Sequence, residues 1–177
     1  MTTAHLTQAT IEADPNLPII RITRDFTGTV AQLMRAHTDP ELYARWVGPD
    51  DTTTEIDYWD ARTGGNWRFL GRRGEEEYAF HGCFHQVTDD RIVQTFTWEG
   101  MPDDVSLEFL RFEDLGDGRT RLHGQSLVES MESRDAWLRS GMEVGVNDGY
   151  AKLDVLLSEG PLRKPEANNQ VPAGGES

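Results

Sequence analysis

Apolar and polar residues alternate through GGNWRFLGRRGEEEYAFHGCFHQVTDDRIVQTFTWEGMPDDVSLEFLRFEDLGDGRTRLHGQSL, residues 64–127. Alternation over short runs is typical of β-strands that bury one face. Turn-forming residues interrupt the run at 71–74, 89–90, 100–104 and 116–118. Because connections this short cannot join parallel strands, the sequence predicts an antiparallel meander.

Working outward from this run, the spacing predicts six strands near residues 53–60, 66–70, 76–87, 91–98, 104–113 and 119–127. An earlier strand is marked by Ile19, Ile20, Ile22 and Phe26. Residues 29–46 predict two short helices, because Asp39 offers an N-cap directly before Pro40. Residues 133–158 carry apolar side chains at steps of three and four, which predicts one long helix with a single apolar face.

These elements together predict an α+β fold, in which a curved antiparallel sheet of about seven strands is combined with two short helices and one long C-terminal helix. A length of 177 residues is typical of one domain. The polar residues 1–16 and the proline- and glycine-rich residues 161–177 are expected to be flexible tails. The folded domain is therefore expected at residues 17–160.

Composition narrows the classes of function. The chain is 37% hydrophobic and 27% charged, which is a globular balance. No run approaches the roughly 18 apolar residues of a membrane span, and no signal peptide is evident, so a cytoplasmic location is expected. The single Cys83 cannot form an intramolecular disulfide. A formal net charge of -14 opposes binding to nucleic acids and anionic membranes.

An aromatic wall is the main candidate site. Aromatic residues share one parity along the predicted strands, and if that parity faces inward they line a concave apolar surface opposite the long helix. In that helix, Gly141, Gly145 and Gly149 recur at steps of four and suggest close approach to the sheet floor or to a ligand. The candidate ligand-binding residues are Trp46, Trp67, Phe69, Phe80, Phe84, Phe96, Trp98, Phe109, Met142 and Val146. Filling of a protein core is the competing use of these rings.

Metal and cofactor chemistry find little support in the sequence. His81 and His85 lie four residues apart on one strand, roughly 13 Å, so they cannot chelate one ion. The glycine pairs and clusters sit at hairpins, and no phosphate-binding loop, dinucleotide fingerprint or nucleophile elbow is present. Neither a metal nor a cofactor is expected. Glu108 and Glu99 are candidate acid–base groups, but Glu108 has the parity opposite to the aromatic wall and Glu99 ends a strand.

The order of these pieces resembles the START-like, or SRPBCC, superfamily, and specifically its branch of activator of heat-shock protein 90 ATPase homologues, which is polyketide cyclase-like. The resemblance covers about residues 18–160. It is carried by ITRDF at 22–26, TDPEL at 38–42 with Trp46 and Gly48-Pro49, GGNWRF at 64–69, YAFHG at 78–82, VQTFTWE at 93–99, and the helix from Gly141 to Leu157. It implies a helix-grip fold, in which the sheet closes over the C-terminal helix.

The resemblance also implies a function, with alternatives. The first is binding of a small hydrophobic or aromatic molecule between the sheet and the helix. The others are a polyketide cyclase or aromatase, and a co-chaperone that contacts a protein partner; whether the chain is an enzyme stays open, as does a possible homodimer. Thr27-Gly28-Thr29 and Val47 depart from the family pattern in the region that roofs the cavity, so the resemblance supports the architecture more firmly than any ligand.

Overall fold

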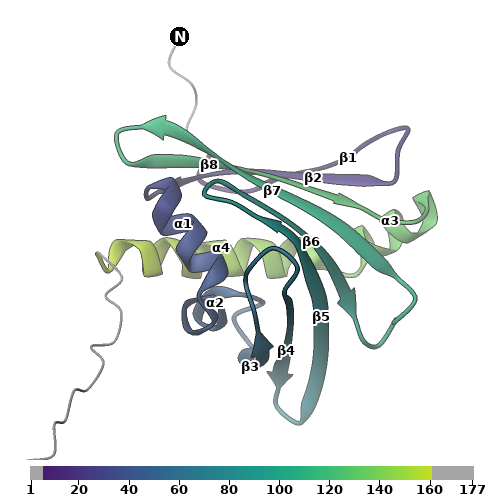
Figure 1. Cartoon of the computed structure of the whole chain (residues 1–177). Helices are drawn as coiled ribbons and strands as arrows, with labels where there is room; N and C mark the ends of the chain where they lie inside the picture. Colours follow the sequence, from purple (N-terminus) through teal and green to yellow (C-terminus); the bar gives the residue numbers. More distant parts are fainter. Residues whose placement is uncertain (1–5, 161–177) are drawn as a thin grey trace, which may run out of the picture.

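A single antiparallel sheet of eight strands dominates the computed structural model, which describes residues 6–160. The strand order is β1-β2-β8-β7-β6-β5-β4-β3, and Figure 1 shows the sheet curving strongly along this order. The strands are β1 (Thr10–Ala13), β2 (Ile19–Thr27), β3 (Thr53–Trp59), β4 (Asn66–Arg73), β5 (Glu76–Val87), β6 (Arg91–Trp98), β7 (Val105–Gly116) and β8 (Arg119–Leu127). The predicted α+β fold and antiparallel meander are confirmed.

The strand count exceeds the predicted seven because of β1. Thr10–Ala13 were expected within a flexible tail of residues 1–16, but Thr10 pairs with Thr23 and Ala13 with Ile20 at the sheet edge. Ile11 is half-buried and packs against the core. A short edge strand with one apolar contact is too weak a pattern to recognise in sequence. Residues 1–5 and the predicted C-terminal tail, 161–177, lie outside the described residues.

The two short helices occur where the sequence predicts them. Helix α1 (Val30–Thr38) begins with a capping box, in which Thr29 and Gln32 each accept a hydrogen bond from the other's backbone N–H. Helix α2 (Pro40–Trp46) begins at the predicted Asp39 N-cap. The indole Nε1 of Trp46 donates to the carbonyl oxygen of Ala36 at 2.9 Å and ties the two helices together.

The predicted long helix is in fact two, α3 (Met131–Arg139) and α4 (Met142–Ser158). Gly141 separates them with φ +85°, a left-handed conformation that glycine adopts without strain. Two of the three ridge glycines, Gly145 and Gly149, lie against the end of α2 and the loop after it, whereas a Cβ on Gly141 would meet nothing within 4 Å. A Cβ on Gly149 would lie 3.0 Å from the Trp46 carbonyl oxygen, and one on Gly145 would lie 3.6 Å from Pro49.

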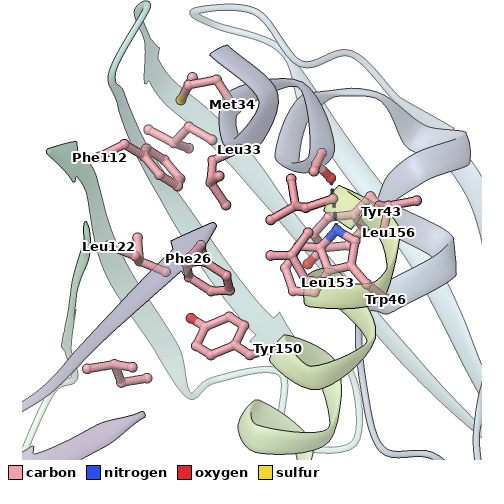
Figure 2. Packing of buried hydrophobic residues seen from close by; sticks show 14 of the residues in the cluster. Phe26, Leu33, Met34, Tyr43, Trp46, Phe112, Leu122, Tyr150, Leu153 and Leu156 are labelled. Carbon is pink, nitrogen blue, oxygen red and sulfur yellow. Dashed lines mark hydrogen bonds between the residues drawn. The ribbon is translucent and has the colours of Figure 1, made fainter. Parts of the chain in front are cut away.

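The hydrophobic core lies between the concave face of the sheet and the helices. Phe26 of β2 meets Tyr150 of α4 edge to face at 5.3 Å, while Leu33, Leu122 and Leu153 are fully buried around them (Figure 2). Burial of each such side chain stabilises the fold by about 1.5–3 kcal/mol. Among the described helices, none is long and apolar enough to cross a membrane.

Candidate functional site

Strand register decides which side chains face the helices. Trp67 lies opposite Gly82, Phe80 opposite Trp98, and Phe96 opposite Ser106, so these positions share the concave face. The rings of Trp67, Phe69, Phe80 and Phe96 form a chain of contacts, with successive centroids 5.6, 5.1 and 5.5 Å apart. Trp137 of α3 extends the chain at 6.3 Å from Phe96. The predicted aromatic wall therefore exists on β4, β5 and β6.

The ten candidate ligand-binding residues fall into three groups. Four are buried in the core: Trp46, Trp67, Phe69 and Phe84. Four are half-buried and packed against the core from the sheet and from α4: Phe80, Phe96, Met142 and Val146. Two are outside the core cluster: Trp98 has the concave parity but packs over Gly100 in the turn after β6, and Phe109 faces outward.

The predicted parity of β7 is wrong. Phe109 pairs with Val93 and Gln125 on the outer face, whereas Glu108 pairs with Gln94 and Ser126 on the concave face. Both faces of β7 carry apolar side chains, Leu107 and Phe109 outside and Leu110 and Phe112 inside, so alternation alone could not tell them apart. Glu108, set aside on parity, is the carboxylate that faces the helices.

Glu108 is held by hydrogen bonds inside an apolar environment. Gln94 Nε2 donates to its carboxylate at 3.0 Å, and Ser126 forms a further hydrogen bond. Burial raises the pKa of Glu108 above its ordinary 4.5, although these two hydrogen bonds oppose the rise. A carboxyl group with a raised pKa holds its proton to higher pH than an exposed glutamate does, which suits it to act as an acid as well as a base.

Two tyrosines lie near this carboxyl group. Burial raises the pKa of Tyr43 on α2 and of Tyr150 on α4, and the charge of Glu108 raises both further. Both hydroxyls therefore stay protonated as hydrogen-bond donors at physiological pH. Glu108, Gln94, Ser126, Tyr43 and Tyr150 are called the Glu108 cluster below. Sequence reasoning missed all but Glu108, because a tyrosine or glutamine in an apolar pattern resembles an ordinary core residue.

Three buried polar atoms around the aromatic wall have no hydrogen-bond partner among residues 6–160. They are the indole Nε1 atoms of Trp67 and Trp137 and the hydroxyl of Ser106. All three residues neighbour Phe96. Its ring contacts both indoles, and Phe96 pairs with Ser106 across β6 and β7. An unsatisfied buried donor costs about 1–3 kcal/mol. Polar atoms without a partner in the described residues therefore gather at this end of the concave face.

His37 on α1 is a second titratable group in the interior. Its ring lies 4.8 Å from that of Trp46 and 5.0 Å from that of Phe112, and Nδ1 donates to the Leu33 carbonyl oxygen at 2.8 Å. Burial lowers its pKa to about 4. The imidazole is therefore neutral at pH 7.

This lowered pKa predicts acid sensitivity. Between pH 6.5 and 4 the unfolded chain binds a proton at His37 that the folded chain refuses, so stability falls as pH falls through this window. The contribution lost is about 3 kcal/mol, because each pH unit between 6.5 and about 4 is worth about 1.4 kcal/mol. The unaltered chain should lose stability between pH 7 and pH 4. His37→Gln should lose about 3 kcal/mol less over the same range, as measured by urea unfolding. The exposed His85→Gln is the control; equal acid sensitivity in all three proteins would contradict the assignment.

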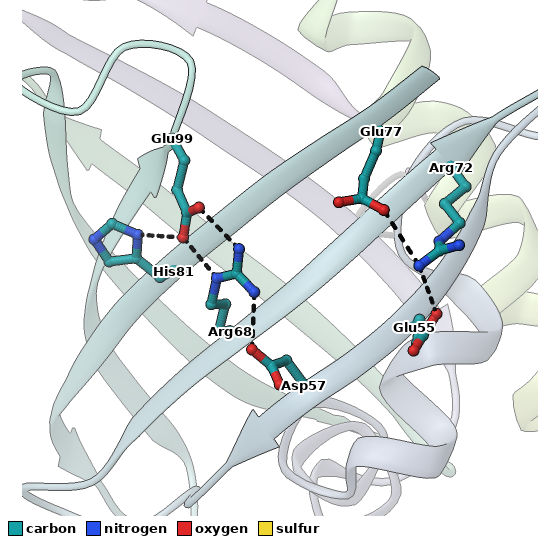
Figure 3. Close-up of polar contacts among 7 residues, drawn as sticks. All are labelled: Glu55, Asp57, Arg68, Arg72, Glu77, His81 and Glu99. Atoms are coloured by element: carbon teal, nitrogen blue, oxygen red, sulfur yellow. Dashed lines mark hydrogen bonds and ion pairs between the residues drawn. The ribbon is translucent and has the colours of Figure 1, made fainter. Parts of the chain in front are cut away.

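The outer face of β3 to β6 carries an ion-pair network (Figure 3). Arg68 binds Glu99 through Nε at 2.8 Å and Asp57 through Nη1 at 2.8 Å, and His81 Nδ1 lies 3.1 Å from Glu99. The hydrogen bond from Arg68 is the main reason that the pKa of Glu99 falls to about 2. Arg72 contacts Glu55 and Glu77 as part of the solvated hairpin. Because its carboxylate is already paired, Glu99 is a structural residue here.

Among the pockets at the surface of residues 6–160, two have no residue of the aromatic wall in their lining. One, of about 270 Å³, lies on the outer face between β2, β6, β7 and β8. The other, of about 330 Å³, lies between β2 and the end of α4, where Arg24 pairs with Asp154 at 2.5 Å. Within residues 6–160, no group of three or more His, Cys, Asp or Glu side chains is placed to hold a metal ion.

Comparisons with known proteins agree with this geometry. A family model described as "Activator of Hsp90 ATPase homolog 1-like protein" matches residues 28–158. No curated protein sequence gives a significant match.

Solved structures resemble the chain over most of its length. A protein from Rhodobacter sphaeroides has a TM-score of 0.77 and 22% identity, over 86% of this chain and 99% of that one. Ms6760 from Mycobacterium smegmatis has a TM-score of 0.76 and 22% identity, over 84% and 96%. DynU16, from the dynemicin biosynthetic locus, has a TM-score of 0.60 and 20% identity, over 81% of this chain and 48% of its own. At such identities the likeness shows the fold alone.

Proposed function

The chain belongs to the family of activator of Hsp90 ATPase homolog 1-like proteins, as its sequence motifs predicted, and on that premise we propose that it binds a small hydrophobic or aromatic molecule. The molecule would lie between the concave face of the sheet and helices α3 and α4. The proposal rests on side chains that face inward but stay partly exposed to solvent. Phe80 and Phe96 on the sheet and Met142 and Val146 on α4 belong to facing layers, yet all four are only half-buried.

The polar groups of the site suit a ligand that carries oxygen atoms. Ligand sites are mostly apolar, with a few polar groups that fix orientation. The unpartnered Ser106 hydroxyl and Trp137 indole can each donate a hydrogen bond to a carbonyl or hydroxyl oxygen. Changes of side-chain rotamer are common on binding, and they would bring the Ser106 hydroxyl and the Trp137 indole nitrogen into contact with the ligand. An oxygenated aromatic compound fits this combination better than a pure hydrocarbon.

Filling the proposed site should remove binding. Val146→Trp places a large side chain on the inward face of α4, while Val144→Trp makes the same change at a residue that is 59% exposed. The probe is N-phenyl-1-naphthylamine, a neutral aromatic dye that fluoresces in apolar surroundings. We expect Val146→Trp to weaken dye binding at least tenfold, which is about 1.4 kcal/mol, and Val144→Trp to leave it unchanged.

Thermal shift gives an independent readout. A ligand at 100 times its Kd stabilises the folded state by about 2.7 kcal/mol, so the dye should raise the Tm of the unaltered chain and of Val144→Trp only. Absence of dye binding by the unaltered chain, or equal loss in both variants, would overturn the proposal.

Glu108 favours a second candidate function, acid–base catalysis of the cyclase or aromatase kind. Its carboxyl group lies on the same concave face as the aromatic wall, two residues from Ser106 on β7. As a carboxylate it would take a proton from carbon next to a carbonyl group, and as an acid it would return one. The Tyr43 and Tyr150 hydroxyls are donors that could stabilise the enolate oxygen formed between these steps.

A further inference from the structure

Three arginines and a histidine gather on the outer face of the sheet, away from the site proposed above. Register places Arg91 directly opposite Arg111, and Arg111 directly opposite His123. In the next row, Phe109 lies opposite Gln125, which lies opposite Arg21. The surface formed by Arg21, Arg91, Phe109, Arg111 and His123 lines the pocket of about 270 Å³ and is called the arginine pocket below.

The pocket places like charges opposite one another on neighbouring strands. Like charges directly opposite on neighbouring strands destabilise a sheet. Arg21 is paired with Asp14 at 2.8 Å, and Glu113 lies 2.6 Å from His123 but 3.9 Å from Arg111. Within the described part of the chain, Arg91 has no ion pair, and its guanidinium lies 5.9 Å from the Phe109 ring centre. Arg91 therefore lacks a counter-charge within the described residues, and the counter-charge of Arg111 is distant, at 3.9 Å.

The surroundings restrict the size of the anion that the pocket can bind. The chain carries a net charge of -14, so a polyanion such as a nucleic acid or an anionic membrane would meet acidic surface beyond the pocket. A single anionic group is screened from that surface over about 8–10 Å and interacts mainly with the nearby arginines. Guanidinium groups bind carboxylates and phosphates through paired hydrogen bonds. The half-exposed ring of Phe109 beside them offers an apolar surface for the rest of the ligand.

We propose that the arginine pocket is a second binding site, for a small organic anion in which a carboxylate or phosphate is joined to an aromatic body. The anionic group lies between Arg91 and Arg111, and the aromatic body packs against Phe109. Binding reduces the repulsion between the two opposed arginines, and it is independent of any ligand between the sheet and α4.

Calorimetric titration with 2-naphthoate and with 1-naphthyl phosphate tests the site. We expect both probes to bind the unaltered chain, and Arg91→Gln/Arg111→Gln to weaken both at least tenfold. The control Arg62→Gln/Arg139→Gln removes the same two charges from exposed positions elsewhere and should bind normally. A stronger response to one probe identifies whether the anionic group is a carboxylate or a phosphate.

Two further variants separate this site from the one between sheet and helix. Phe109→Ala should weaken 2-naphthoate but not inorganic phosphate, and Val146→Trp should bind 2-naphthoate normally. If Arg91→Gln/Arg111→Gln and Arg62→Gln/Arg139→Gln weakened probe binding equally, the effect would be one of long-range charge only. That result would overturn the proposal. Loss of 2-naphthoate binding in Val146→Trp would also overturn it, because the probe would then occupy the inner site.

Discussion

Replacement of Trp67 by alanine should lower the free energy of unfolding by about 3–5 kcal/mol, a large part of the 5–15 kcal/mol that holds a typical domain. Trp67 is 1% exposed, and its ring contacts Trp59, Phe69 and Phe96 within 6.0 Å. It also covers Gly82, where a Cβ would lie 2.6 Å from the Trp67 ring. Removal of the indole would therefore leave a cavity beneath the whole aromatic wall.

Urea unfolding followed by circular dichroism measures this loss, with Trp98→Ala as the matched control. Trp98 is half-buried, lies over the turn at Gly100 and is outside the core cluster, so we expect less than half the effect. Trp67→Phe should recover part of the loss, because it refills some volume and removes the unpartnered indole nitrogen. Equal effects of the two alanine variants would contradict a core role for Trp67.

The fold could be predicted where turn residues and helix caps mark the ends of elements. Glycine and aspartate turns delimit strands β4 to β8, and Asp39 before Pro40 marks the start of α2. The break between α3 and α4 was missed because Gly141 interrupts a helical pattern that continues on both sides, and a single glycine does not by itself end such a pattern. Edge strand β1 was missed because its apolar signal is a single half-buried isoleucine.

The site was less predictable because it depends on register. Trp67 and Phe80 could be placed together from one hairpin, since Gly71 to Gly74 fixes the pairing of β4 with β5. Placing Glu108 required the inward parity of β7, a strand that is apolar on both faces. Phe109 was assigned to the wall for the same reason. The Glu108 cluster takes its residues from β6, β7, β8, α2 and α4. A local sequence pattern cannot predict contacts between elements so far apart in sequence.

Glu108→Gln should abolish proton exchange on a bound carbonyl compound while leaving the fold intact. The probe is benzoylacetone in D₂O: a Glu108 carboxylate removes one proton from the carbon between its two carbonyl groups, and the exchanged carboxyl group returns a deuteron. General acid–base catalysis by a positioned side chain is worth about 10²–10⁴-fold, so we expect the protein-dependent exchange rate to fall at least 10²-fold in the variant. Loss of the probe's α-proton signal by NMR measures the rate.

Stability and pH distinguish this role from a structural one. Because its pKa is raised in the folded state, Glu108 contributes stability that is fully present below pH 4.5 and is lost as pH rises through the folded pKa. Glutamine cannot ionise, so Glu108→Gln should be more stable than the unaltered chain at pH 8 and should show no such decline. Exchange by the unaltered chain should rise over the same pH range, as the carboxylate forms. Glu113→Gln, on the outer face of the same strand, should keep normal exchange; if it lost as much as Glu108→Gln, catalysis by the buried carboxylate would be refuted.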